Sequence, residues 1–290
     1  MIKSILSGVF MLLAIPLFAS RILVPMDDSQ ANHLKAYGVT FWVLGNGVEA
    51  DWLLNYRGGS FMFKNVAAIE NECIIRGVSY QIIADVQAAQ ILDEISDPEV
   101  NMEMVKLEVA PRVAVYSPAG KLPWDDAVTL VLTYAEIPYD IVYDEEVLTG
   151  VLPKYDWLHL HHEDFTGQFG KFYKAYRTAT WYQDEVASQN ASAQIMGFQK
   201  VSEMKREVGV TIRNFVLGGG FLFTMCSGTD SYDISLAAQD VDICEAMFDG
   251  DPAESQASSK LDFSEGFAFQ NYNLEMDPLV YEFSNSDGTK

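Results

Sequence analysis

Gly218-Gly219-Gly220-Phe221-Leu222-Phe223-Thr224-Met225-Cys226-Ser227-Gly228 is the stretch with the clearest structural signal in the chain. Its glycines lead into a short apolar run, and the turn formers Thr229 and Asp230 precede an amphipathic segment at residues 231–238. The pattern predicts a strand, a sharp turn and a helix, with Cys226 on the turn. Nucleophilic cysteines occupy such turns, where the helix N-terminus favours the thiolate. A small apolar cysteine buried at the end of a core strand is the other interpretation, and the local pattern leaves both open.

The composition indicates a globular chain with a substantial core. Of the 290 residues, 49% are hydrophobic and 12% are aromatic, which excludes a disordered chain. The length allows one large domain or two smaller ones. The formal net charge of -22 excludes nucleic acid as a partner, because phosphate binding requires clustered lysine and arginine.

Residues 1–20 differ from the rest of the chain. Lys3 precedes an apolar run at residues 5–18, and the small residues Ala19 and Ser20 follow it. This pattern predicts a secretory signal peptide over residues 1–20, with an uncleaved anchor as the alternative. The run is too short to span a bilayer comfortably. We therefore expect a periplasmic or secreted protein with no stable membrane insertion after signal cleavage.

The cysteines do not form a disulfide framework. There are three of them and no Cys-x-x-Cys spacing. Cys73 lies in an apolar stretch and is predicted to belong to a core. A Cys226–Cys244 disulfide is left open for an oxidising compartment.

Short β-like runs alternate with helical patterns along the chain. Residues 23–53 and 115–143 each predict a β-α-β unit of ordinary size. We therefore expect an α/β fold, a three-layer sandwich with a mostly parallel sheet. Ligands in such folds bind at the carboxyl ends of the strands. That rule would place Cys226 and residues 159–164 at the same edge of the sheet.

Composition also suggests where the chain divides. Residues 21–96 predict an N-terminal α/β unit that is packed on the core or is part of it. Residues 97–111 are polar, contain Pro98 and Pro111, and predict a linker. Residues 112–290 predict a second α/β domain.

Three of the four histidines lie in the segment His159-Leu160-His161-His162-Glu163-Asp164. On a strand, His159 and His161 would share one face. Histidines near carboxylates can bind zinc or supply a general base to a thiol, and structural histidines at a strand end are the plain alternative. We assign His161, His162 and Glu163, with Cys226, to the candidate catalytic set. We expect no metal and no cofactor.

A second set of residues is predicted to bind substrate: Gly219, Gly220, Ser227, Gly228, Asp230 and Arg57. Arg57 lies in a Gly-rich turn at residues 55–60 and could hold an anionic group, although a plain loop is the alternative. Residues 227–231 are similar to the pyrophosphate-binding loop Ser-Gly-Gly-x-Asp-Ser of ATP-dependent amidoligases, but one residue is missing. A deletion there would disturb the cradle of backbone amides.

Aromatic residues recur at near-helical spacing after the histidine segment. The spacing predicts a helix that packs on the sheet, and a platform for a carbohydrate ligand is the alternative. The residues concerned are Phe165, Phe169, Phe172, Tyr173, Tyr176, Trp181 and Tyr182.

Several of these segments together resemble a family of exported proteins from Bacteroidota that is commonly labelled asparagine synthetase B. They are Asp27-Asp28-Ser29-Gln30, Asn32-His33-Leu34-Lys35-Ala36-Tyr37-Gly38, residues 52–61 and residues 158–165. The resemblance covers nearly all of the chain after Arg21. It implies a longer protein with a His-containing segment beyond residue 290, so that the polar tail at residues 284–290 would mark a truncation. Asparagine synthetases of that class expose an N-terminal cysteine, whereas a predicted signal peptide occupies this end, so ATP-dependent amide synthesis ranks last.

Residues 218–228 are in addition similar to class I glutamine amidotransferase-like domains, which have a flavodoxin-like fold. Cys226 falls at the position of their nucleophile, and active members also need a His and a Glu after it. No histidine follows Cys226 in this chain. The resemblance implies an exported cysteine-dependent amidohydrolase with an oxyanion hole of backbone amides. The alternative is a non-catalytic domain of the same fold that binds a small molecule or a glycan, and the substrate and the oligomeric state are left open.

Overall fold

The computed structural model describes residues 20–118 and 126–286. The chain forms two compact units that divide between Ala110 and Pro111. The apolar run of the predicted signal peptide lies outside the described residues, and Ser20 is the first residue of strand β1. Among the described residues, no helix has the length and apolar composition that crossing a bilayer requires.

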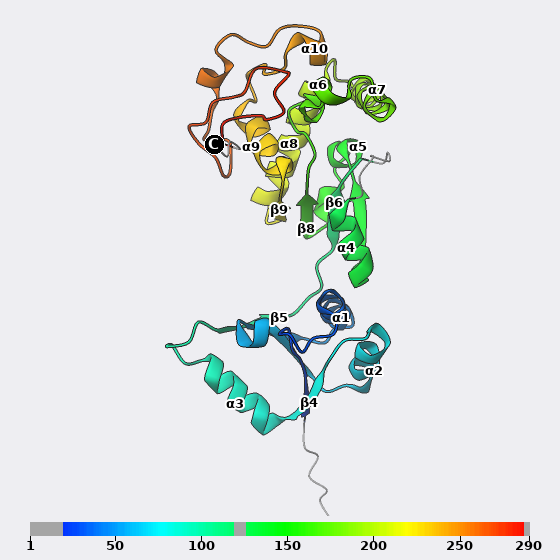
Figure 1. The fold of residues 1–290 in the computed structure, drawn as a ribbon, viewed down its shortest axis with the longest axis vertical. Helices are drawn as coiled ribbons and strands as arrows, with labels where there is room; N and C mark the ends of the chain where they lie inside the picture. The colour runs from blue at the N-terminus through cyan, green and yellow to red at the C-terminus, as the bar shows by residue number, and fades with distance from the viewer. Residues whose placement is uncertain (1–19, 119–125, 287–290) are drawn as a thin grey trace, which may run out of the picture. The chain divides into compact units, whose positions relative to one another are not determined.

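The N-terminal unit is a five-stranded antiparallel sheet with a helical layer on each face (Figure 1). Ile22 and Phe63 point to the face that packs on α1 and α2, whereas Leu23 and Met62 point to the face that packs beside α3. This alternation follows from the two-residue period of a strand. The strands, in the sheet order β4-β1-β3-β2-β5, and the helices are β1 (Ser20–Val24), β2 (Ala50–Leu54), β3 (Ser60–Lys64), β4 (Gln81–Ala84), β5 (Glu103–Leu107), α1 (His33–Gly45), the 3-10 turn η1 (Tyr56–Gly58), α2 (Ala67–Arg76) and α3 (Asp85–Ile95).

The prediction of a mostly parallel sheet is wrong for this unit. Strand β3 lies between β1 and β2 and is antiparallel to both. The turn between β2 and β3 is short, with Asn55 at φ 61° and Gly59 at φ 94°. A tight turn of this kind joins antiparallel neighbours, because a parallel pair needs a crossover of about a dozen residues or more.

The predicted linker at residues 97–111 is also partly wrong. Residues 103–107 form β5, which pairs with β2 in the register Trp52↔Val105. Strand β5 is an edge strand, and none of its residues is fully buried. Its polar residues Glu103 and Lys106 are exposed, and this explains why the segment resembled a linker.

The C-terminal unit is built on a parallel four-stranded sheet in the order β7-β6-β8-β9. This part of the chain confirms the expected α/β fold with a parallel sheet. Its elements are β6 (Val113–Tyr116), α4 (Ala127–Ala135), β7 (Tyr139–Val142), α5 (Asp144–Leu148), η2 (Leu152–Lys154), β8 (Trp157–Leu160), η3 (Phe169–Lys171), α6 (Tyr173–Tyr176), α7 (Thr180–Ile195), α8 (Val201–Leu217), β9 (Phe221–Thr224), α9 (Ser227–Ala237), α10 (Ala246–Asp249) and η4 (Ala257–Lys260).

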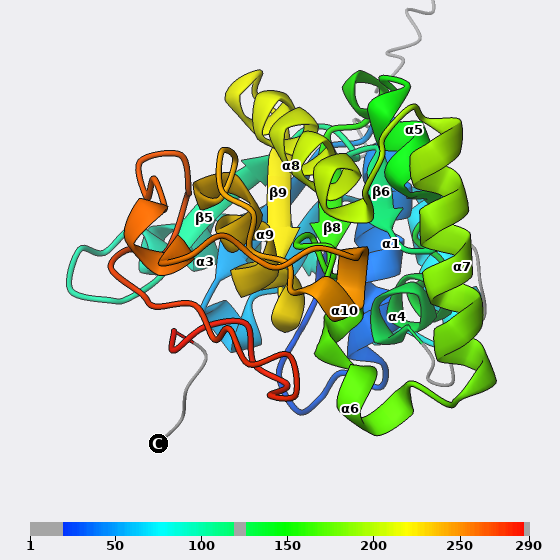
Figure 2. The same ribbon diagram turned by 90° about the horizontal axis from the view of Figure 1, so that it is seen from above.

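One face of this sheet packs against α8 and α9, as Figure 2 shows for α8 alongside β8 and β9. Leu158 and Leu160 of β8 meet Val208 of α8 and Leu236 of α9 in a buried cluster. Helix α9 is buried along most of its length, because its other side contacts the irregular segment at residues 241–283. The helix that follows Cys226 is therefore packed on both sides.

The strand order also locates a crevice. The chain runs from β6 to its neighbour β7 on one side, then crosses to β8 on the other side of β6. Such a reversal opens a crevice outside the carboxyl ends of the two strands that flank it, and ligands of open α/β sheets bind there. The residues that follow β6 and β8 are therefore the first place to look for a site.

Candidate functional site

Cys226 occupies a strained turn between β9 and α9. Strand β9 ends at Thr224, helix α9 begins at Ser227, and Cys226 has φ 55° and ψ -148°. Glycine is almost the only residue that adopts this backbone region without strain. The thiol is free and exposed. The predicted strand, turn and helix are confirmed, although the helix begins four residues before the predicted start at Ser231.

Gly228 allows the turn to pack against the neighbouring strand. Its N–H donates to the carbonyl of His161, with an N–O distance of 2.9 Å. A Cβ atom on Gly228 would lie 2.5 Å from the same oxygen. Only glycine therefore permits α9 to approach the end of β8 this closely.

The first turn of α9 is bonded to three successive carbonyls after β8. Besides the bond from Gly228 to His161, the Ser227 hydroxyl donates to the carbonyl of His162 at 3.1 Å. The Ser231 hydroxyl donates to the carbonyl of Glu163 at 2.9 Å. Residues 161–163 and Cys226 thus lie at the same edge of the sheet, as the sequence predicted.

The two histidines of this edge contact each other. The Nδ1 atoms of His161 and His162 are 3.2 Å apart, and Nδ1 of His161 lies 3.8 Å from the Oδ1 atom of Asp126. Asp126 caps α4 by accepting from two backbone N–H groups. Burial lowers the pKa of His162, with a further contribution from the nearby His161. His162 is therefore neutral near pH 7, which is the state a general base needs.

The Cys226 sulfur accepts and donates no hydrogen bond among the described residues. The structure thus brings the predicted histidines to the loop beside the thiol without joining them to it. In a protein without bound substrate, catalytic hydrogen bonds are often long and tighten only in the substrate complex.

Glu163 is a buried carboxyl in the same loop. Its residue is 5% exposed, and one oxygen, Oε2, accepts from the backbone N–H of His161 at 3.0 Å. The other oxygen, Oε1, is buried and has no hydrogen-bond partner among the described residues. Burial is the main reason that the pKa of Glu163 is raised to about 7.

A pocket of about 40 Å³ opens beside this loop at the crevice that the strand order predicts. Carboxyls and aromatic rings predominate in its lining: Pro118, Tyr143, His162, Glu163, Asp164, Phe169, Gly170, Phe172, Trp181, Tyr182, Glu185 and Gln189. The aromatic residues of α6 and α7 were predicted to pack on the sheet. They instead form a cluster with Val201 and Met204 of α8 and with Phe248. The sequence showed their spacing but not which element they would contact.

A buried charge cluster lies next to Tyr143, one of the residues that line the pocket. Lys205 of α8 is 1% exposed, and its Nζ atom lies 2.9 Å from the carboxylate of Asp144. The same Nζ donates to the hydroxyls of Tyr116 at 3.0 Å and Tyr143 at 3.2 Å. The sequence gave no signal for this cluster, because its members lie up to 89 positions apart.

Three predicted substrate-binding residues do not fit that role. Gly219 and Gly220 precede β9, at the end of the strand opposite to Cys226, and form the turn that leads from α8. Arg57 belongs to the N-terminal unit, where its guanidinium pairs with Asp27 at 2.6 Å. This ion pair lowers the pKa of Asp27. The predicted anion-binding cation is thus already neutralised by a carboxylate.

The remaining predicted residues lie at the turn. Ser227 and Gly228 are the first residues of α9, and Asp230 is buried within it. Residues 227–231 are helical, so their amides do not form the loop that cradles pyrophosphate.

The other two cysteines are buried and free. Cys73 lies in the core of the N-terminal unit, as predicted. The disulfide left open between Cys226 and Cys244 is absent. Burial raises the pKa of the Cys244 thiol, which donates to the carbonyl of Thr166 at 3.2 Å.

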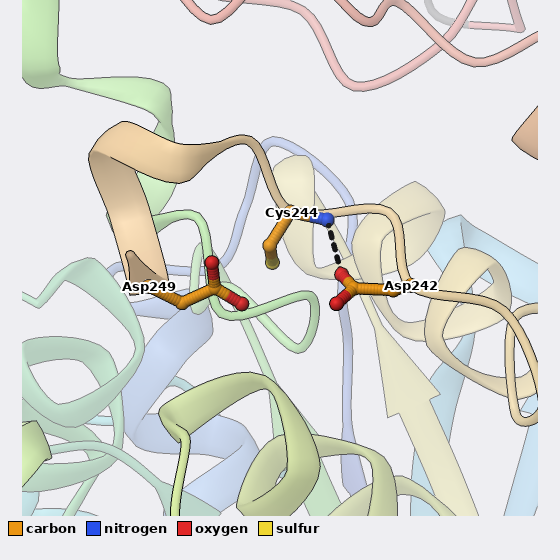
Figure 3. Close-up of side chains that lie close together, drawn as sticks. All are labelled: Asp242, Cys244 and Asp249. Carbon is orange, nitrogen blue, oxygen red and sulfur yellow. Dashed lines mark hydrogen bonds between the residues drawn. The ribbon is translucent and has the colours of Figure 1, made fainter. Parts of the chain in front are cut away.

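Cys244 lies with Asp242 and Asp249 in a cluster whose ligand atoms could hold a cation (Figure 3). A cation is already present, because Nζ of Lys200 lies 3.0 Å from Asp242 and 3.2 Å from Asp249 and also pairs with Asp251. The carboxylates raise the pKa of Lys200. The cluster thus ties the segment at residues 242–251 to the start of α8, and we assign no metal to it.

Comparison of the chain with models of protein families, with curated proteins and with solved structures finds no match. The function is therefore inferred from the geometry of the site.

Proposed function

We propose that this protein is a cysteine-dependent amidohydrolase with Cys226 as its nucleophile. The observation that carries the proposal is the backbone of Cys226, at φ 55° and ψ -148° between a parallel strand and a helix. Nucleophiles of α/β hydrolytic enzymes occupy the same kind of strained turn, which exposes the side chain above the sheet. An exposed thiol gains little from burial, so packing gives no reason for a cysteine there.

The order of the parallel strands supports a flavodoxin-like fold of the class I glutamine amidotransferase type. Numbered in chain order, β7-β6-β8-β9 corresponds to 2-1-3-4, which is the start of the flavodoxin order 2-1-3-4-5. We also propose, from the resemblance of residues 27–38, 52–61 and 158–165, that the chain belongs to the exported family named above. The pattern of residues 1–20 supports export by a signal peptide.

In the proposed reaction the Cys226 sulfur attacks the amide carbon of a substrate. The C–N bond breaks, the thiol proton passes through His162 to the leaving nitrogen, and a thioester remains on the sulfur. Water then adds to the thioester carbon, which gives a carboxylic acid and restores the thiol. The Ser227 N–H, at the start of α9, would stabilise the oxyanion, because the first N–H groups of a helix have no partner within it.

Alkylation by iodoacetamide tests this proposal. At pH 7, Cys226 should react at least about tenfold faster in the folded protein than in the urea-unfolded chain, because a helix N-terminus stabilises the thiolate. A His162→Gln variant should lose part of that advantage, whereas a Glu207→Gln variant, changed at an exposed site on α8, should keep it. Equal rates in folded and unfolded protein would rule out an activated nucleophile.

A second candidate is a non-catalytic domain that binds a small ligand at the same edge. The observation that favours it is that no described residue bonds to the Cys226 sulfur. Hydrolysis distinguishes the two candidates. A binding domain would show no release of amine or ammonia from any amide that it binds, and the Cys226→Ala variant would bind as well as the native chain.

A further inference from the structure

The pocket next to residues 162–164 has the size of a small head group. Its volume is about 40 Å³, whereas an engineered cavity of about 150 Å³ holds benzene. The space within the pocket is therefore smaller than that of a cavity that encloses an aromatic ring. A group of a few heavy atoms at the end of a longer molecule fits.

Three of the side chains that line the pocket are carboxyls. Oε1 of Glu163 is buried and has no hydrogen-bond partner among the described residues. The Glu185 carboxylate accepts from the Gln189 side chain at 2.7 Å, and Asp164 accepts from the N–H of Gly170 at 2.9 Å. An ionised carboxylate can only accept, so a ligand that satisfies Oε1 of Glu163 in its ionised form must donate a hydrogen bond to it.

The lining of the pocket is also acidic when its carboxyls are ionised. Among the described residues, no lysine or arginine lines it, and the nearby Lys205 is paired with Asp144. Burial raises the pKa of both Glu163 and Glu185, and the charge of Lys205 opposes this rise only in part. A cation bound in the pocket would favour the ionised carboxylates further.

Aromatic rings line the pocket with these carboxyls. Phe172 and Trp181 pack edge to face at 5.8 Å, and Trp181 contacts Tyr182 in the same way. The negative face of an aromatic ring attracts a cation, most strongly when water is excluded. Carboxylates and rings in one small pocket are the combination that recognises ammonium groups.

We propose that this pocket binds a primary ammonium group, and that the substrates of the enzyme are amides that carry such a group. The second part rests on the proposed function. His162 connects the pocket with the turn at Cys226. It lines the pocket, and its carbonyl accepts a hydrogen bond from Ser227, the residue after Cys226. A substrate anchored by its ammonium group would extend from the pocket toward the thiol.

Calorimetric titration of the full chain carrying Cys226→Ala tests the pocket without any catalysis. The probe is n-propylammonium, and n-propanol and propionate are its neutral and anionic counterparts at equal ionic strength. We expect propylammonium to bind in the range of ~0.1–10 mM, which is realistic for a four-atom probe. Propanol should bind at least ~10-fold more weakly because it lacks the charge, and propionate should not bind.

Two variants locate the binding. Glu163→Gln keeps the shape of the side chain and should weaken propylammonium at least ~10-fold, and Glu185→Gln should weaken it as well. Glu207→Gln, on the exposed side of α8, should leave it unchanged. No binding of propylammonium, equal binding of propanol, or unchanged binding in both pocket variants would overturn the proposal. Binding as expected, together with no hydrolysis of any ammonium-bearing amide, would instead overturn the proposed function.

Discussion

Replacing Cys226 by glycine should stabilise this protein while abolishing the proposed chemistry. Cys226 has φ 55° and ψ -148°, a backbone region in which a residue with a Cβ atom is strained and glycine is not. The side chain is exposed, so its removal loses little buried apolar area. The stability effect should therefore come from the backbone.

The size of the effect follows from two opposing terms. A non-glycine residue in such a region costs about 1–3 kcal/mol. Glycine makes the unfolded chain more flexible, which costs about 0.4–1 kcal/mol. The comparison of Cys226→Gly with Cys226→Ala isolates these terms, because neither variant has the sulfur. We expect the glycine variant to be more stable by roughly 0.5–2 kcal/mol, which is about 1–8 °C in the melting temperature of a unit of this size.

Differential scanning calorimetry of the full chain measures this shift. The adjacent residue Met225 gives a matched control, since it is also exposed and does not have a positive φ. There the change from alanine to glycine should destabilise the protein by about 0.5–1 kcal/mol. The two positions should thus respond with opposite sign. The same loss of stability at both positions would show that the turn at Cys226 is not strained.

Three further predictions concern the surroundings of the turn. Gly228→Ala should cost about 1–3 kcal/mol in unfolding free energy, because its Cβ would lie 2.5 Å from the His161 carbonyl oxygen, and chemical denaturation measures it. Lys205→Met should lower the unfolding free energy by about 3–5 kcal/mol, because it leaves Asp144 buried and unpaired. The double variant Lys205→Met with Asp144→Leu should recover most of that loss in the same assay. Glu163 should make the stability of the native chain depend on pH. The folded state holds a proton on Glu163 up to a pKa of about 7, whereas the unfolded state releases it near 4.5, so the native chain should lose about 3 kcal/mol of stability between pH 4.5 and 7 relative to Glu163→Gln. Parallel pH profiles of the two proteins would contradict this.

The local structure of the C-terminal unit could largely be predicted from the sequence. The apolar run ending at Thr224 and the turn formers after it place the strand and the turn, and α8 ends at Leu217, just before the glycines. These signals are local, because they depend on side-chain period and on turn chemistry. The sequence also predicted that Cys226 and residues 161–163 lie at the same edge of the sheet, because the carboxyl ends of parallel strands meet there.

The errors arose where distant residues decide the structure. The N-terminal unit also contains strands separated by helices, yet its sheet is antiparallel. Its strands β2 and β3 follow each other directly, and the short turn at residues 55–59 joins them as neighbours. Gly219 and Gly220 looked like part of the site because they are close to Cys226 in sequence. Strand β9 lies between these glycines and Cys226, and the two ends of a strand lie at opposite edges of the sheet.

The backbone at Cys226 supports the proposed role of its thiol when it is compared with the glycines of the chain. Glycine is present at several demanding backbone positions, as at Gly219 with φ 101° and at Gly228, where a Cβ atom does not fit. Other residues with positive φ include Glu136, whose φ of 59° and ψ of 39° lie in the left-handed helical region, which tolerates a Cβ atom better than the region of Cys226. At residue 226 the backbone is equally demanding, yet a cysteine is present. Bonds from α9 to residues 161–163 and from backbone N–H groups to Asp233 hold the turn in place, so the fold tolerates the strain. Backbone strain alone would favour glycine at this position, so the presence of a cysteine supports the proposal that its thiol is a nucleophile.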